Sequence, residues 1–252
     1  MRVVLKAMMV LVLVSVGPCI IGEPAIGDTS DQKPGSEACV ILLHGLCRSG
    51  RSMLKIQHRL ETAGYTVINL DYDSTRQSIE MAAAAKVAQA VAVCRERGFD
   101  RIHFVTHSLG GLVVRAFLQD HELPAGSRVV MLAPPNHGSE LADTALDHLP
   151  ALYGMGGPAA RELATGSPLV SHTLKPVPGE IGVIAGGLSF NPIFSHFLPG
   201  LDDGKVTVQS TRLTEMKDFI VLPTNHTLIL WDDSTGRQIL YFLAHGSFLH
   251  KS

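Results

Sequence analysis

The chain has 252 residues, 46% of them hydrophobic, and a formal net charge of −2 at pH 7. This length and composition fit one α/β domain with a large buried core, and the near-neutral charge without a basic patch excludes an electrostatic footprint for nucleic acid. The 12 histidines and 4 cysteines follow none of the spacings that zinc sites use, and no glycine-rich phosphate loop is present. We therefore expect no metal and no cofactor.

The amino-terminal segment has the pattern of an export signal. Arg2 and Lys6 precede an uncharged stretch, residues 7–21, which is too short to span a bilayer comfortably. We expect residues 1–27 to be a signal peptide, with cleavage near Gly22 or after 25–27, and residues 28–252 to be one domain in the periplasm or outside the cell. An uncleaved membrane anchor is the alternative.

Export permits disulfides. If cleavage removes Cys19, the mature chain keeps Cys39, Cys47 and Cys94, so at most one internal pair can form, and the sequence does not say which. Cys47 is a second candidate nucleophile, but nothing in the sequence places a base beside it. We expect a structural or free thiol there.

Strand and helix patterns alternate along the rest of the chain. A near-continuous apolar strand starts at Ala38 and ends at His44-Gly45, and another strand is predicted over residues 65–70. Helices are predicted over residues 52–63 and 78–97. This alternation predicts a mostly parallel central sheet with helices on both faces, in a minimal version because little chain precedes Ala38.

Ser108 lies in the sharp turn between an apolar strand, residues 101–105, and an apolar helix, residues 112–118. Such a turn exposes a nucleophilic hydroxyl if small residues stand two positions before and after the serine. Gly110 meets this requirement and Thr106 does not. The amide of Leu109 opens the helix and is free to bind an oxyanion. The alternative is a serine that only caps the helix.

A second amide for an oxyanion is expected from the loop after an early strand. Leu46, which follows the strand that ends at His44-Gly45, is the candidate. In the alternative interpretation Gly45 only turns the chain.

These two motifs resemble the α/β-hydrolase superfamily, and within it the small bacterial lipases and esterases that carry His-Gly and Thr/Ala-His-Ser-x-Gly-Gly. The resemblance covers nearly all of the mature chain. Residues 69–76 are similar to a post-strand loop of these lipases in which Tyr-Pro-Ser-Thr is frequent, with Asp73 in place of the proline. Residues 133–139 resemble a family turn that follows the next strand.

The resemblance implies a base and an acid beyond Ser108, in the order serine, acid, histidine. His226 follows a strand-like run, residues 219–223, and so lies at a strand's carboxyl end. The family's Asp-Gly-x-Val loop selects Asp203, with the adjacent Asp202 as its competitor. Other histidines lack the right preceding strand, precede a plausible acid or lie near the tail: His121, His137, His148, His172, His196, His245 and His250.

Residues 139–179 mix Leu, Ala, Gly and Pro without a clear strand, at a position where the family often carries a cap over the active site. Several apolar side chains there are candidates to line an acyl pocket or to be ordinary core: Leu141, Leu146, Leu149, Leu152, Tyr153 and Met155.

The sequence thus predicts hydrolysis of carboxylic esters or lipids through an acyl-enzyme, with Ser108, His226 and Asp203 as the triad. Contact with a membrane or lipid interface is a further expectation. An exported acyltransferase or thioesterase would use the same residues, and a non-catalytic binding protein is the third alternative. The sequence does not determine the acyl chain, the head group or the oligomeric state.

Overall fold

The computed structural model describes residues 37–148, 156–170 and 174–250. The chain divides into two compact units, Met1–Gln32 and Lys33–Ser252, and all described residues belong to the second unit. The signal peptide predicted for residues 1–27 lies outside the described residues. Among the helices that the structure describes, none is long and apolar enough to cross a membrane.

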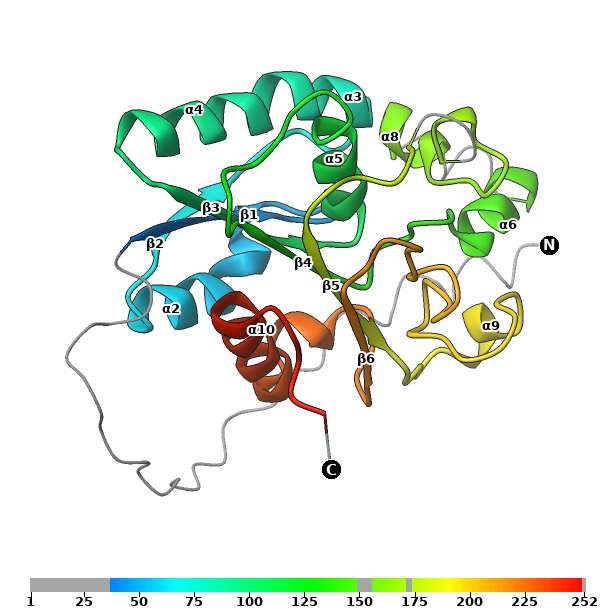
Figure 1. Ribbon diagram of the computed structural model, residues 1–252. Helices are drawn as coiled ribbons and strands as arrows, with labels where there is room; N and C mark the ends of the chain where they lie inside the picture. Colours follow the sequence, from blue (N-terminus) through cyan, green and yellow to red (C-terminus); the bar gives the residue numbers. More distant parts are fainter. Residues whose placement is uncertain (1–36, 149–155, 171–173, 251–252) are drawn as a thin grey trace. The chain divides into compact units, whose positions relative to one another are not determined.

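The described chain is built on one six-stranded sheet with the order β2-β1-β3-β4-β5-β6 (Figure 1). Every neighbouring pair of these strands is parallel, so the predicted mostly parallel sheet is confirmed and is parallel throughout. The strands are β1 (Ala38–Leu43), β2 (Thr66–Leu70), β3 (Arg101–His107), β4 (Arg128–Leu132), β5 (Glu180–Gly186) and β6 (Asp218–Leu222).

The central strands are apolar on both faces because helices cover both sides of the sheet. All six residues of β1 are buried, and its alternate side chains enter two separate cores. Cys39, Ile41 and Leu43 face one core, whereas Ala38, Val40 and Leu42 face the other. The alternation of side chains along a strand therefore explains why this run carries no polar residue.

Helices α3, α4 and α5 cover one face of the sheet, and α2 and α10 cover the other (Figure 1). The expected helix 78–97 forms with a π turn, η2, between α3 and α4, and the Ser78 side chain caps its first turn. The helices are η1 (Gly50–Met53), α2 (Leu54–Thr62), α3 (Ile79–Ala82), η2 (Ala83–Val87), α4 (Ala88–Glu96), α5 (Leu109–Phe117), α6 (Glu140–His148), α8 (Gly157–Glu162), α9 (Pro192–Ser195), η4 (Leu228–Leu230) and α10 (Asp233–His245).

A disulfide joins Cys39 in β1 to Cys94 in α4, inside the core beneath the α3–α5 layer. Cys47 is a free, exposed cysteine. The pairing that the sequence left open is thus between two residues 55 positions apart, and it ties the central strand to the helix that covers it.

The segment over which a cap is predicted, residues 139–179, is described only in part. Four of its expected pocket residues lie in 149–155, outside the described residues, while Leu141 and Leu146 in α6 are half-buried. Other apolar residues of the segment belong to the main core: Leu163, Leu169, Leu174 and Val177. At least part of this segment is therefore ordinary core, and its covering role stays a prediction.

Candidate active site

Ser108 occupies the turn between β3 and α5 with φ 52° and ψ −121°, a backbone conformation that non-glycine residues rarely adopt. Holding a residue there costs about 1–3 kcal/mol, which surrounding contacts must offset. The Ser108 amide donates to the Leu132 carbonyl of β4 at 2.9 Å. The serine makes no side-chain capping bond to the helix, so the interpretation as a simple helix cap is wrong.

Small residues let neighbouring segments of the backbone approach this turn. A Cβ on Gly110 would lie 2.8 Å from the Leu43 carbonyl oxygen, and one on Gly45 would lie 3.1 Å from the Cβ of Ser108. Thr106, the departure from the usual small residue, lies beside Gly111: a Cβ on Gly111 would make only an ordinary contact with the Thr106 hydroxyl, at 3.5 Å, but would lie 2.9 Å from the Cβ of Pro134. Gly111 therefore permits the close approach of Pro134, in the loop after β4.

Ser108, His226 and Asp203 form a hydrogen-bonded row. The Ser108 hydroxyl donates to His226 Nε2 at 3.1 Å, and His226 Nδ1 donates to Asp203 Oδ2 at 2.7 Å. All three residues are buried, with exposed fractions of 8%, 6% and 2%. The imidazole is therefore held in the tautomer whose Nε2 can accept the serine proton.

The two adjacent aspartates make different contacts. Asp203 Oδ1 accepts the amides of Lys205 and Val206 at 2.9 and 2.8 Å, which fixes the carboxylate while Oδ2 faces His226. Asp202 Oδ1 instead accepts the Ser195 hydroxyl and the Gly204 amide. The structure thus brings Asp203 to the histidine and uses Asp202 to hold the loop.

The two predicted oxyanion amides flank the same turn. Leu109 opens α5 directly after Ser108, and Leu46 follows Gly45, the residue that touches the turn. Within the described ranges, neither amide donates to a backbone or side-chain acceptor. Unpartnered backbone N–H groups at the start of a helix or in a loop are suited to bind a developing negative oxygen.

The loop after β2 holds the Leu46 loop in place. The Tyr72 hydroxyl donates to the His44 carbonyl at 2.6 Å, and the Cys47 amide donates to Ser74 Oγ at 3.1 Å. Asp73, which replaces the family's proline, accepts the Thr75 amide and hydroxyl through one carboxylate oxygen. The aspartate therefore tightens this turn by hydrogen bonds where a proline would do so by its ring.

His107 is a site residue that the sequence reasoning did not single out. Its Nε2 donates to the His226 carbonyl at 2.9 Å, and the two rings lie 4.9 Å apart. Burial, and next the neighbouring His226, hold the pKa of His107 well below its usual range, so its ring is neutral. The only sequence signal for it was its place directly before Ser108 at the end of a buried strand.

A profile of the alpha/beta hydrolase family matches residues 40–238. The chain belongs to the alpha/beta hydrolase family. The match runs from within β1 to within α10 and so includes the strand, turn and loop on which Ser108, Asp203 and His226 lie. No curated protein gives a significant sequence match.

Solved structures of lipases and esterases share this fold. The mature form of the Bacillus licheniformis lipase BlEst2 is 21% identical with a TM-score of 0.65, over 86% of this chain and 95% of the lipase. The propeptide form of the same lipase is 20% identical with a TM-score of 0.72, over 90% of this chain and 54% of the propeptide form.

Two further solved structures of similar fold are those of a carboxyl esterase and a thioesterase. The metagenomic carboxyl esterase MGS0156 is 20% identical with a TM-score of 0.62, over 85% of this chain and 70% of the esterase. The RedJ thioesterase of Streptomyces coelicolor is 13% identical with a TM-score of 0.51, over 88% of this chain and 90% of the thioesterase. At these identities the similarity concerns the fold.

Proposed function

We propose that this protein hydrolyses carboxylic esters with Ser108 as nucleophile, His226 as base and then acid, and Asp203 as the residue that orients His226. The observation that carries the proposal is the continuous hydrogen-bonded row from Ser108 Oγ through the imidazole to Asp203 Oδ2. A serine hydroxyl is a weak nucleophile near pH 7, and such a row is what activates it.

The reaction follows in two halves. His226 Nε2 takes the proton of Ser108 as Oγ attacks the ester carbonyl, and the amides of Leu46 and Leu109 bind the oxyanion. His226 returns the proton to the departing alcohol, leaving an acyl-enzyme. Water then repeats the sequence, and the carboxylic acid leaves. The Asp203 carboxylate stabilises the imidazolium in both halves.

Exposed apolar side chains in the segment that leads to the acid loop support apolar acyl groups and contact with a lipid interface. We call them the apolar ridge: Leu188, Phe190, Ile193, Phe197 and Leu201, all exposed, with Ile193 68% and Phe190 65% accessible. No Asp, Glu, Lys or Arg occurs in residues 181–201. Exposed apolar patches of this kind mark binding surfaces, and this one leads directly into Asp202 and Asp203.

We also propose that the protein is exported. The expected signal at residues 1–27 supports this, and so does the Cys39–Cys94 disulfide, because disulfides persist in oxidising compartments outside the cytosol.

Purified protein assayed on nitrophenyl esters of increasing chain length tests the proposal. We expect Ser108→Ala to lower kcat by about 10⁴-fold or more, with Ser234→Ala in α10 as an unaffected control. A fluorophosphonate should label the wild type and not the Ser108 variant. Activity that survives Ser108→Ala would contradict the proposal.

A rate jump above the solubility limit of the longer esters would support interfacial contact, and its absence would favour a soluble-ester hydrolase. Thioester substrates and added acceptor alcohols in the same assay separate hydrolysis of esters from the two activities that would use the same residues.

A further inference from the structure

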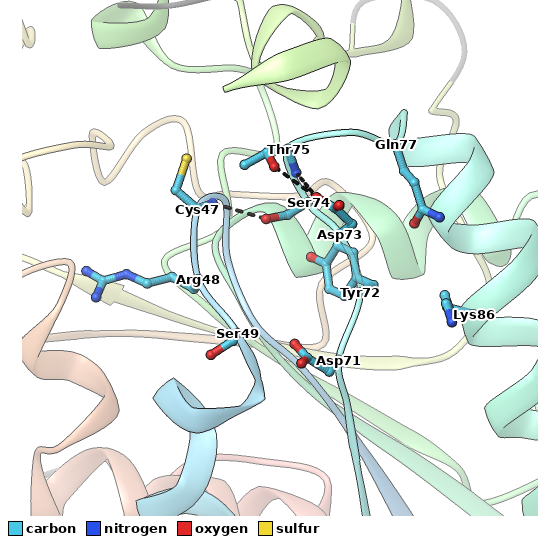
Figure 2. Close-up of a pocket in the computed structure, with 10 residues that line it drawn as sticks. All are labelled: Cys47, Arg48, Ser49, Asp71, Tyr72, Asp73, Ser74, Thr75, Gln77 and Lys86. Carbon is cyan, nitrogen blue, oxygen red and sulfur yellow. Dashed lines mark hydrogen bonds between the residues drawn. The ribbon is translucent and has the colours of Figure 1, made fainter. Parts of the chain in front are cut away.

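An open cleft of about 670 Å³ lies beside the candidate active site, at the carboxyl ends of β1 and β2 (Figure 2). Residues 47–49, which follow β1, form one wall. Residues 71–75 and Gln77, which follow β2, and Lys86 in the π turn η2 form the rest. We call it the β1–β2 cleft.

The sheet order places this cleft next to Ser108. β1 lies between β2 and β3, and Ser108 directly follows β3, so the two strands that lead into the cleft are one and two strand spacings, roughly 5 and 10 Å, from the strand that leads into the serine. Its wall begins at Cys47, the residue after Leu46. The same wall reaches the histidine loop, because Arg48 Nη2 donates to the hydroxyl of Thr227, the residue after His226, at 3.3 Å.

The lining of the cleft is polar and balanced in charge. Two cations and two carboxylates line it, so their formal charges cancel: Arg48, Lys86, Asp71 and Asp73. The remaining lining is mainly hydroxyl and amide groups: Ser49, Tyr72, Ser74, Thr75 and Gln77. Such a surface does not suit an acyl chain, and its balanced charge does not select an anion.

Two of these side chains have hydrogen-bonding capacity that the described protein does not use. The Oε1 atom of Gln77 is buried without a partner. Lys86 takes part in none of the ion pairs that the described residues make. Figure 2 shows both on the helix side of the cleft, across from Cys47 and Ser49. π turns are frequent at functional sites, and this one carries Lys86. A buried acceptor and a free ammonium group call for a ligand that both donates and accepts, which is the property of hydroxyl groups.

We propose that the β1–β2 cleft binds the alcohol part of the ester substrate, and that this part is a polyol such as a glyceryl or sugar group. The inference rests on the proposed ester hydrolysis. It places the two parts of the substrate on opposite sides of Ser108: the polyol toward β2 and the acyl chain toward the apolar ridge.

Kinetics with one acyl group and three alcohols test the assignment: ethyl butyrate, glyceryl monobutyrate and glucose 6-butyrate. We expect Gln77→Leu and Lys86→Met each to lower kcat/KM for the polyol esters about fivefold to tenfold more than for ethyl butyrate. Gln89→Leu, an exposed glutamine in α4 that does not line the cleft, is the matched control and should lower neither. Equal losses on all three esters in the cleft variants would overturn the assignment.

Binding decides the question independently of turnover. In the Ser108→Ala background, calorimetric titration of glyceryl monobutyrate should show affinity reduced about fivefold to tenfold by Gln77→Leu and unchanged by Gln89→Leu. If a Gln77→Leu variant has the same melting temperature as its parent and binds glyceryl monobutyrate with unchanged affinity, the assignment of the cleft is wrong. If the wild type binds the polyol ester in this way but cleaves no ester, the proposed function fails and the cleft stands.

Discussion

The two edges of the sheet differ in how their polar groups are used. At the amino edge, the first residues of four strands are charged and each has a partner: Arg101 in β3, Arg128 in β4, Glu180 in β5 and Asp218 in β6. At the carboxyl edge, three described non-glycine residues have positive φ, and each follows a strand: Cys47, Ser108 and Ala133.

The amino edge is a closed network. Glu180 accepts from Arg128 Nε at 2.5 Å and from Lys217, while Arg128 also donates to the Leu243 carbonyl of α10. The Arg128 amide donates to the buried ring of His103 at 2.9 Å. These contacts join β3, β4, β5 and α10, so they serve stability.

The carboxyl edge keeps strain and unused polar groups. Among the residues that the structure describes, His107 Nδ1 and Thr106 Oγ1 are buried without partners, and Gln77 Oε1 is a third such atom in the same region. Buried polar atoms are normally satisfied, so exceptions gathered with strained residues mark a site of function. The comparison predicts that changes at the carboxyl edge alter activity, whereas changes at the amino edge alter stability.

The largest effect is expected for the pair of aspartates at the carboxyl edge. Asp203→Asn should lower kcat by about 10⁴-fold, because the histidine loses the carboxylate that fixes its tautomer. Asp202→Asn, one residue away but bonded to Ser195 and Gly204, is the matched control and should lower kcat by less than about tenfold. Equal losses would contradict the assignment of Asp203.

A smaller effect, on stability alone, is expected for His103 at the amino edge. Burial, aided by Arg128 and Arg101, lowers the pKa of His103 to about 4 from an ordinary value of 6.5. As pH falls from 6.5 toward 4, the unfolded chain binds a proton that the folded protein does not, so folding loses up to about 3 kcal/mol.

His103→Asn keeps an acceptor for the Arg128 amide and removes the titrating group. The wild-type free energy of unfolding should therefore fall more steeply than that of the variant between pH 6.5 and 4, while activity at pH 7 is unchanged. Urea unfolding at several pH values measures this difference. Parallel pH profiles would show that His103 does not contribute.

The smallest effect is expected for Glu180→Gln. Hydrogen bonds from Lys217 and then Arg128 lower the pKa of Glu180, but its side chain is 35% exposed and solvent screens the pair. We expect a loss of about 1 kcal/mol in unfolding free energy at pH 7. The contribution is present above the ordinary glutamate pKa and is lost as pH falls through the lowered one. If Glu180→Gln lowered activity under conditions where the variant stays folded, the contrast between the two edges would be wrong.

Local sequence patterns predicted several of the strands and helices and the turn in which Ser108 lies. The strands and helices carry apolar runs with the periodicity of their own secondary structure. Ser108 lies where the pattern of a strand ends and the pattern of a helix begins. The family profile confirms the predicted fold class.

Other features depend on which segments meet in space. Asp202 and Asp203 are adjacent in sequence, and only the fold of residues 202–206 turns one toward His226 and the other toward Ser195. In the same way, only the packing of α4 on β1 selects Cys94 as the partner of Cys39.

The sequence by itself therefore determined the sheet and the turn in which Ser108 lies, because these follow from neighbouring residues along the chain. The tertiary structure decided which aspartate contacts His226, the disulfide, the contact of His107 with His226 and the polar cleft beside Ser108. Each of these depends on contacts between segments that are far apart in the sequence, and the pattern within one segment does not give its distance from another.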